Sequence, residues 1–366
     1  MKTAAEILCD LISIRTDPEV KTNQEMVDYV TSCLAENGAE FALVPTGQSN
    51  NIVAGINVDS LNNIDDGIVL AGHMDTVGCE LQNWKTNPFQ GTQQDGKIFG
   101  RGAMDMKHFI AVVLSLLPQL KKLPFPVLFA FSCDEETEVL GVQDIVAFFK
   151  KQNIHPKYVL IGEATDFKLA VSNRGYIGYQ TYVQGIAGHA GNPELGTNAI
   201  YIASQIISRI EELNQKYAKQ GTTLNVGKIE GGSGRNSIPA TVFFDWEIRY
   251  QQDVMKGKML AELEDFYQKL QIKYPDAVVT NETKESLPAF EKQESILCQT
   301  AESILKTEKI VFPYASEAGF FQSCGMDVLI CGAGDFNVAH TADEYVLISD
   351  VERYRDFVLN LLENLK

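Results

Sequence analysis

The sequence is poor in basic side chains and in histidine. Its 366 residues include 31 lysines and arginines against 48 aspartates and glutamates, so the formal net charge is −17. A negative excess of this size repels phosphate backbones and anionic lipid headgroups. We therefore expect neither nucleic acid nor a membrane among the partners. Only five histidines are present, so any histidine-based chemistry must use few positions.

A disulfide pattern and a long apolar run are also lacking. The seven cysteines are an odd number and contain no CxxC pair, which argues against a disulfide framework and fits a reducing compartment. The longest apolar runs, such as residues 109–117, are too short to span a bilayer. The first residues follow the pattern of an amphipathic helix rather than that of a signal peptide. We expect a cytoplasmic protein.

Short, nearly continuous apolar runs alternate with helical segments along much of the chain. Runs of this kind are typical of strands that are buried on both faces of a sheet. They occupy residues 68–72, 126–133, 158–162 and 327–332. Because parallel strands of this kind alternate with helices, the pattern predicts an α/β fold, a mostly parallel sheet with helices on both faces.

Residues 175–283 have a different pattern. They contain strand-like stretches with alternating polar and apolar residues, an amphipathic helix with Thr197 or Asn198 as its cap, and a second helix at roughly 252–272. This order predicts an inserted α+β domain of the ferredoxin-like type. The remaining residues, 1–174 and 284–366, then form the main domain.

Polar side chains follow each of the predicted parallel strands. In open α/β sheets the carboxyl ends of the strands face the ligand-binding crevice, so these side chains should meet at one edge. They are His73, Asp75, Glu135, Glu136, Glu163 and His340, and Asp105 joins them from the start of a helix. Each alone could be a structural pair, a helix cap or an acidic turn. Together they form a donor set for two divalent metal ions, because burying so many carboxylates without cations is very costly.

Several motifs, taken together, resemble one enzyme family. They are AGHMDTV (71–77), Trp84, NPF (87–89), GRGAMDMK (100–107), DEE (134–136), IGE (161–163), GHAGNPELGTNAI (188–200) and AHTADEYV (339–346). Their order over nearly the whole chain is similar to that of the dizinc aminoacyl amidohydrolases and peptidases, the family of acetylornithine deacetylase and succinyl-diaminopimelate desuccinylase. YASEAGFF (314–321) and the C-terminal motif look most like the acetylornithine deacetylase branch.

This resemblance implies a ligand role for five residues. His73 and Glu163 would bind one metal ion, and His340 and Glu136 would bind the other. Asp105 would bridge the two ions. Zinc is the expected metal, with cobalt or manganese as alternatives, because sites of imidazole and carboxylate accept all three.

The resemblance also implies how the reaction proceeds. Asp75 would hydrogen-bond the far nitrogen of His73 and fix its tautomer. Glu135 would take a proton from a metal-bridging water that attacks the acyl carbonyl, and would return it to the departing amine. A cis peptide bond is implied between Asp105 and Met106.

Substrate contacts are expected from several other positions. In the family the histidine that matches His189 reaches the active site of the partner subunit and helps to hold the oxyanion, which implies a homodimer formed through the inserted lid domain. Asn236 and Arg249 match positions that hold the α-carboxylate of the substrate. Glu317 is an acid that could bind a cationic ornithine amine. His108 stands where relatives commonly carry glycine, a departure that affects packing or the metal environment.

These observations predict metal-dependent hydrolysis of the N-acyl amide bond of an amino acid. N-acetylornithine is the first expected substrate, which gives ornithine and acetate within arginine biosynthesis. Succinyl-diaminopimelate, another N-acyl amino acid or a dipeptide remain alternatives. A metal-binding scaffold without catalysis is the competing hypothesis from another class, and the presence of every expected ligand and of the base argues against it.

Overall fold

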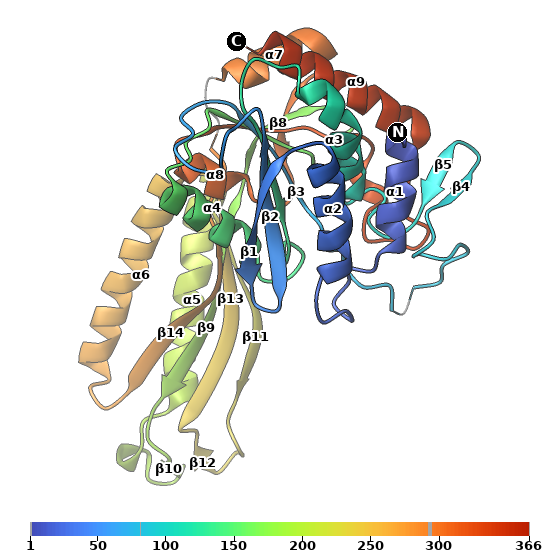
Figure 1. The fold of residues 1–366 in the computed structure, drawn as a ribbon. Coiled ribbons are helices and arrows are strands. Elements are labelled where there is room, and N and C mark those ends of the chain that lie inside the picture. Colours follow the sequence, from blue (N-terminus) through green and yellow to red (C-terminus); the bar gives the residue numbers. More distant parts are fainter. Residues whose placement is uncertain (1, 81, 292–294, 366) are drawn as a thin grey trace. The chain divides into compact units, whose positions relative to one another are not determined.

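The computed structural model describes residues 2–80, 82–291 and 295–365, and the chain divides into two compact units (Figure 1). Unit 1 comprises Met1–Val171, Lys292–Phe312 and Ser316–Lys366, and unit 2 comprises Ser172–Glu291 and Pro313–Ala315. The inserted domain expected from the sequence, 175–283, begins three residues after the start of unit 2 and ends eight residues before Glu291.

Unit 1 is built on an eight-stranded sheet in the order β1-β2-β6-β3-β7-β16-β8-β15. The four strands β6, β3, β7 and β16 at its centre are parallel, whereas β2 beside β6 and β8 beside β16 are antiparallel. The bounds are β1 Glu40–Thr46, β2 Ser49–Ile56, β3 Ile68–His73, β6 Val127–Ser132, β7 Tyr158–Ile161, β8 Leu169–Asn173, β15 Lys309–Phe312 and β16 Asp327–Ile330. The four apolar runs therefore form the parallel centre, which confirms the α/β prediction.

Helices cover both faces of this sheet. α1, α3 and α9 pack against one another on one face, and α4 and α8 lie on the other (Figure 1). The bounds are α1 Ala4–Ser13, α2 Gln24–Glu36, α3 Lys107–Leu120, α4 Gly141–Gln152, α7 Ile296–Leu305, α8 Ala318–Ser323, α9 Ile348–Asn364 and the 3₁₀ turn η3 Phe336–Val338. Among the described residues, none of the helices combines the length and the apolar character needed to cross a membrane.

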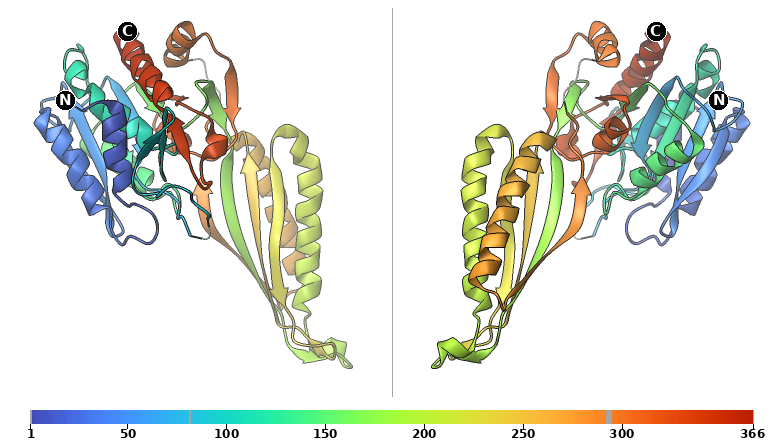
Figure 2. Two further views of the ribbon diagram at one scale, coloured as in Figure 1. Left: turned by 90° about the vertical axis from the view of Figure 1, so that its right-hand side faces the viewer. Right: turned by 90° about the vertical axis from the view of Figure 1, so that its left-hand side faces the viewer.

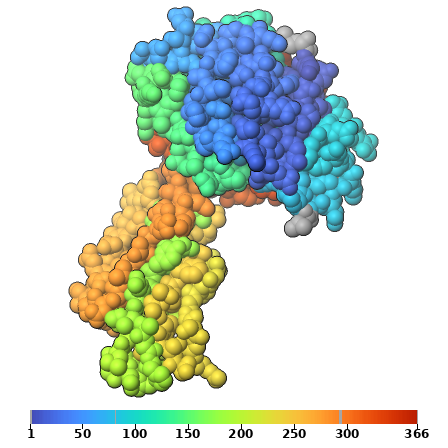
Figure 3. Space-filling view, turned by 60° about the horizontal axis from the view of Figure 1, so that its bottom comes forward, coloured from blue at the N-terminus to red at the C-terminus, as the bar shows by residue number. Residues whose placement is uncertain are grey.

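A small three-stranded sheet, β17-β5-β4, belongs to the same unit. Its strands are β4 Thr92–Gln94, β5 Lys97–Phe99 and β17 Tyr345–Leu347. In the space-filling view the cyan segment that carries β4 and β5 stands out from the surface of unit 1 (Figure 3). Since β17 pairs with β5, the C-terminal motif lies beside the segment that leads to α3.

The start of α3 approaches the parallel strands very closely. A Cβ atom added at Gly162 would lie 2.1 Å from the ring of Phe109, and one at Gly72 would lie 2.7 Å from the Cε of Met106. Only a residue without a side chain leaves room for these two α3-segment side chains. The glycines thereby bring the beginning of α3 against the ends of β3 and β7, where His73 and Glu163 are located.

Unit 2 contains a four-stranded antiparallel sheet in the order β11-β13-β9-β14. Figure 2 shows α5 and α6 along this sheet, and together the elements have the β-α-β-β-α-β order of a ferredoxin-like domain. Phe244, Trp246 and Ile248 of β13 alternate with polar residues and enter the core of this unit. The bounds are β9 Gly175–Gln184, β10 Gly188–His189, η1 Pro193–Leu195, α5 Ala199–Tyr217, η2 Ala218–Gln220, β11 Thr223–Gly231, β12 Ser237–Ile238, β13 Thr241–Tyr250, α6 Asp253–Lys273 and β14 Val278–Leu287.

The last strand of unit 2 is absent from the sequence-based prediction. β14 is an edge strand that pairs with β9, and nearly all of its side chains are exposed. Apolar alternation, which indicates half-buried strands, is therefore missing from its sequence. This explains why the inserted domain was expected to end at 283, within the strand.

Candidate metal centre

The carboxyl ends of the parallel strands bring the expected ligands to one edge of the sheet. His73 is the last residue of β3 and pairs in register with Ser132, the last residue of β6. Glu136 follows β6 after a short loop, and Glu163 follows Ile161, the last residue of β7. The inference from strand ends is therefore confirmed by the register of the sheet.

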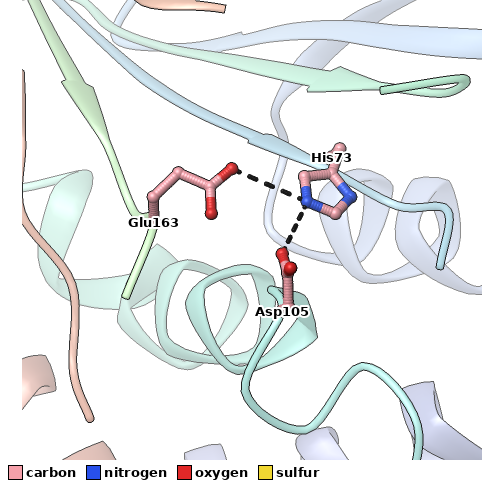
Figure 4. Close-up of side chains that lie close together, drawn as sticks. All are labelled: His73, Asp105 and Glu163. Carbon is pink, nitrogen blue, oxygen red and sulfur yellow. Dashed lines mark hydrogen bonds and ion pairs between the residues drawn. The ribbon is translucent and has the colours of Figure 1, made fainter. Parts of the chain in front are cut away.

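Three of these side chains form a first donor group (Figure 4). The Nε2 of His73 lies 2.9 Å from Oδ1 of Asp105 and 3.6 Å from Oε1 of Glu163. The side chains are almost completely removed from solvent, with 1%, 5% and 8% exposed, respectively. Figure 4 shows both carboxylates directed at the same ring nitrogen. This is the arrangement in which one cation can be held by all three.

A second donor group shares Asp105 with the first. The Nε2 of His340 lies 3.1 Å from Oδ2 of Asp105 and 3.0 Å from Oε1 of Glu136. Each group has its ligand atoms within 4.8 Å of one another. Because Asp105 offers one oxygen to each group, its position is that of a bridging ligand. The peptide bond between Asp105 and Met106 is cis, as the resemblance implied.

The electrostatics of the cluster show an excess of negative charge. Burial raises the pKa of Glu163 well above its usual range, and the nearby charge of Asp105 raises it further. Hydrogen bonds to Asp105 and Glu136 raise the pKa of His340 to about 10. Burial alone would raise the pKa of Asp105 too, but hydrogen bonds from the two histidines hold it below its usual range. Protons are thus retained where divalent cations would offset the same charge, so the donor set fits two metal ions.

The contact of Asp75 with His73 differs from the expected one. The Nδ1 of His73 lies 3.0 Å from the backbone carbonyl oxygen of Asp75, whereas the Asp75 carboxylate is 3.6 Å away. That carboxylate instead accepts a hydrogen bond from the backbone N–H of Glu136 at 3.0 Å. The carbonyl therefore orients the imidazole, and the carboxylate connects the loop of Glu136 to β3.

Glu135 is half-buried and precedes Glu136 in the loop after β6. Burial raises the pKa of Glu135 well above its usual range, and the charges of Glu163, Glu136 and Asp105 add to this effect. The loop is held at its start, where the buried Asn51 accepts a hydrogen bond from the N–H of Cys133 at 2.9 Å. A carboxylate of this kind, near the ligands but outside both donor groups, is suited to proton transfer.

Glu317 does not lie on an accessible surface. It directly precedes α8 in unit 1 and is 3% exposed. Burial raises its pKa to about 7, and its charge interacts with those of His73 and Asp75. The expected contact of Glu317 with a substrate amine stays a prediction. The structure places its carboxyl group inside the protein, where it interacts with the charge of the expected ligand His73.

His108 is a core residue of α3. Its side chain is 0% exposed, and its ring meets that of Tyr354 edge-on, with centroids 6.1 Å apart. Burial lowers its pKa to about 4, so the ring is neutral at physiological pH. His108 belongs to neither donor group.

The three expected residues of the inserted domain lie at two places within unit 2. His189 of β10 pairs with Ser237 of β12, and the N–H of Ala190 donates to the carbonyl oxygen of Asn236 at 3.0 Å, so His189 and Asn236 lie close together. Figure 1 shows β10 and β12 at one end of unit 2. Arg249 lies near the other end of β13. Its Nε donates to Glu247 at 2.9 Å.

Sequence reasoning missed three buried charged residues beside the ligands. Arg101 and Glu344 form an ion pair, and Lys107 donates to two backbone carbonyls of the segment that ends α1, at 2.8 and 3.0 Å. All three lie within the motifs that carry the resemblance. They could have been noticed in the sequence because charged residues stand there within segments that otherwise consist mainly of apolar residues and expected metal ligands.

Comparisons with known proteins agree with this site. Residues 69–364 match the sequence profile of peptidase family M20/M25/M40. An acetylornithine deacetylase from Buchnera aphidicola subsp. Schizaphis graminum (strain Sg) is 27% identical over 358 residues, which cover 94% of this chain and 92% of the relative.

Solved structures show the same fold. A tripeptidase from Staphylococcus aureus subsp. aureus Mu50 superposes with a TM-score of 0.77 at 20% identity, covering 99% of this chain and 97% of the other. A dinuclear metal-binding peptidase of the M20 family from Bacillus subtilis superposes with a TM-score of 0.71 at 14% identity, covering 99% and 98%.

Proposed function

The chain belongs to peptidase family M20/M25/M40 and is a metal-dependent hydrolase, and from this premise we propose that it removes the acyl group of an N-acyl amino acid. N-acetylornithine is the proposed substrate, with ornithine and acetate as products. The observation that most strongly supports metal-dependent hydrolysis of an amide bond is the pair of donor groups that share Asp105, with Glu135 beside them.

The proposed cofactor is a pair of divalent ions, with zinc as first choice and cobalt or manganese as alternatives. His73 and Glu163 would hold one ion, His340 and Glu136 the other, and Asp105 both. When bound, two such ions lower the pKa of a water molecule and polarise the acyl carbonyl, which is the chemistry that amide hydrolysis needs.

The proton is proposed to move through Glu135. Its carboxylate lies beside the ligands without belonging to either donor group, and its raised pKa in the metal-free protein reflects the burial and the negative charge around it. It would accept a proton from the attacking water and deliver it to the amine of the departing amino acid, which must leave protonated.

Substrate binding is proposed to involve Arg249 and Asn236. Arg249 is suited to a bidentate contact with an α-carboxylate, but it is already paired with Glu247 and lies 5.2 Å from the ring centroid of Tyr176. A substrate carboxylate must therefore share or replace that partner. Arg249 is therefore a paired cation rather than a free one.

A homodimer is the second part of the proposal. Arg249 lies eight positions from Thr241 along β13, about 26 Å at 3.3 Å per residue, and Thr241 begins the strand near the end of unit 2 that carries His189. One small substrate cannot reach both ends of the same unit. If His189 and Arg249 act on one substrate, they must come from two copies of the chain, joined through unit 2.

The cellular setting is proposed from the substrate and from the cysteines. None of the seven cysteines, all of which lie in the described part of the chain, forms a disulfide, which suits the reducing cytoplasm. Removal of acetate from N-acetylornithine places the reaction in arginine biosynthesis. A peptidase activity is the alternative that the tripeptidase fold relative favours.

A substrate panel tests the proposed function. Zinc-loaded protein is assayed on N-acetylornithine, N-succinyl-diaminopimelate, N-acetylmethionine and simple dipeptides, each with and without chelator. We expect the highest kcat/KM on N-acetylornithine and loss of turnover with chelator. A clear preference for a dipeptide would replace the deacetylase by a peptidase, and no hydrolysis of any member would contradict the enzyme proposal.

A further inference from the structure

We propose that Arg101 and Glu344 are positioning residues that join the segment of Asp105 to the segment of His340 and so set the geometry of the metal centre. Neither side chain belongs to a donor group. The proposal rests on the two-metal centre described under the proposed function, and it adds residues to which no role has been given.

The two side chains form an ion pair inside unit 1. Arg101 is 1% exposed and Glu344 is 0% exposed, and Nη1 of Arg101 lies 2.5 Å from Oε2 of Glu344. Such a pair contributes little to stability by itself, because the cost of removing both charges from water offsets most of their attraction. Its effect therefore depends on what its remaining hydrogen bonds hold in place.

The second oxygen of Glu344 holds the backbone of the bridging ligand. Its Oε1 accepts hydrogen bonds from two consecutive backbone groups, the N–H of Met104 at 2.8 Å and the N–H of Asp105 at 3.2 Å. The backbone carbonyl of Glu344 also accepts from the N–H of Gly100 at 2.9 Å. The segment before the Asp105 side chain is thus fixed by one buried residue.

The second terminal nitrogen of Arg101 extends the network to the other ligand. Its Nη2 donates to the side-chain oxygen of Gln82 at 2.7 Å, and the Nε2 of Gln82 donates to the backbone carbonyl of His340 at 2.9 Å. The ring of Trp84 lies 5.3 Å from the guanidinium carbon of Arg101. One chain of hydrogen bonds therefore runs from the backbone of Asp105 to that of His340.

These two anchored residues are the ones whose side chains meet in the second donor group, 3.1 Å apart. Donor spacing decides how well an ion is held, and residues that orient ligands typically change metal affinity by roughly 10–100-fold when they are replaced. The network therefore acts on both donor groups through Asp105, and on the second group alone through Gln82.

The test measures zinc affinity rather than turnover. Metal-free parent, Glu344→Gln and Gln82→Leu are titrated with zinc in competition with a chelator, and bound zinc per subunit is counted. We expect Glu344→Gln to weaken both ions by roughly 10–100-fold, and Gln82→Leu to weaken one of the two by a similar factor. Glu262→Gln, which removes a carboxylate from the ion pairs with Arg209 and Lys216 in unit 2, is the matched control and should bind like the parent.

Melting of the metal-free variants separates positioning from general stability. Variants that melt earlier but bind two zinc ions with parental affinity would overturn the proposal, because the network would then only support the fold. If Glu344→Gln does not fold, the zinc affinity of Gln82→Leu tests the proposal instead. Gln82 is partly exposed, and its replacement leaves the buried pair of Arg101 and Glu344 intact. A parent that binds fewer than two ions would overturn the metal centre itself, and this role with it.

Discussion

At the residue scale, the chemistry depends on carboxylates that cannot all remain charged without cations. Asp105 and Glu163 are nearly completely buried beside His73, and Glu135 and Glu136 lie within the same cluster. In the metal-free protein, bound protons offset part of this negative charge: the pKa values of Glu163 and Glu135 are raised, and the pKa of His340 is about 10. Metal binding must therefore release protons, so zinc affinity should rise with pH.

The buried ring of His108, which is not one of the expected metal ligands, gives a prediction for the pH dependence of stability. Its pKa is about 4 in the folded protein and near 6.5 when unfolded, so between these values the unfolded state binds more protons. The contribution of His108 to stability is therefore unchanged above pH 6.5 and falls as pH drops toward 4, by a few kcal/mol at most. Urea unfolding of the metal-free parent and of His108→Leu at pH 7 and pH 5 should show a larger loss for the parent. Equal losses would contradict the neutral, buried state of His108.

Single residues show where sequence reasoning was sufficient and where it was not. The register of parallel strands makes residues that follow them neighbours, so His73, Glu163 and Glu136 could be grouped without a structure. The contact of Asp75 could not, because a sequence does not show whether a carbonyl or a carboxylate faces an imidazole. The burial of Glu317 was missed for the same reason, since the path of the backbone decides which way a side chain points.

At the scale of elements, two glycines let α3 approach the ends of β3 and β7. Gly162 faces the ring of Phe109, and Gly72 faces Met106 and Phe109, so both strands and the helix meet without intervening side chains. The segment that precedes α3 carries Asp105. Close approach of the helix is therefore a condition for the bridge between the two donor groups.

The variant Gly162→Ala tests this packing. The added methyl group would overlap the ring of Phe109, and we expect a loss of about 1–3 kcal/mol in unfolding free energy together with weaker zinc binding at the neighbouring Glu163. Gly257→Ala in α6 is the matched control, because nothing lies within 4 Å of the new Cβ and it should stabilise the helix by about 0.5–1 kcal/mol. Urea unfolding and zinc competition measure both effects. An unchanged unfolding free energy and zinc affinity in Gly162→Ala would contradict the close approach of α3 to the end of β7.

Helices and strands could be predicted from the sequence where one buried face gives a periodic pattern of apolar residues. They were missed where no such pattern exists. The alternation along β13 buries every second side chain, and α5 is capped by Asn198, one of the two caps expected from the sequence. β14 has only one fully buried side chain, Leu287, so it carries no alternating pattern. Its pairing with β9 supplies the hydrogen bonds that the side-chain pattern does not reveal.

At the scale of the whole molecule, unit 1 carries the candidate metal centre, and unit 2 carries the proposed substrate residues at both of its ends. His189 and Asn236 share one end of unit 2, and Arg249 lies near the other. The proposed assembly of two copies would allow both ends of unit 2 to contribute to active sites. Symmetric dimers give each copy the same role.

Mixed dimers test this arrangement. Glu135→Gln and His189→Ala should each lose turnover, since one lacks the base and the other lacks the group supplied to its partner. When the two are mixed and allowed to exchange subunits, one site of each hybrid regains both residues, so about a quarter of parental activity should return. No recovery, with hybrids shown to form by mass, would place His189 in its own subunit's reaction or outside the reaction altogether.

The most direct measurement concerns Glu135. Zinc content and turnover of N-acetylornithine are measured side by side for the parent and for Glu135→Gln, which keeps the shape of the side chain but cannot accept the proton. We predict two zinc ions per subunit in both proteins and a fall in kcat of at least about 100-fold in the variant. Near-parental turnover by a variant with full zinc content would contradict the proposed chemistry.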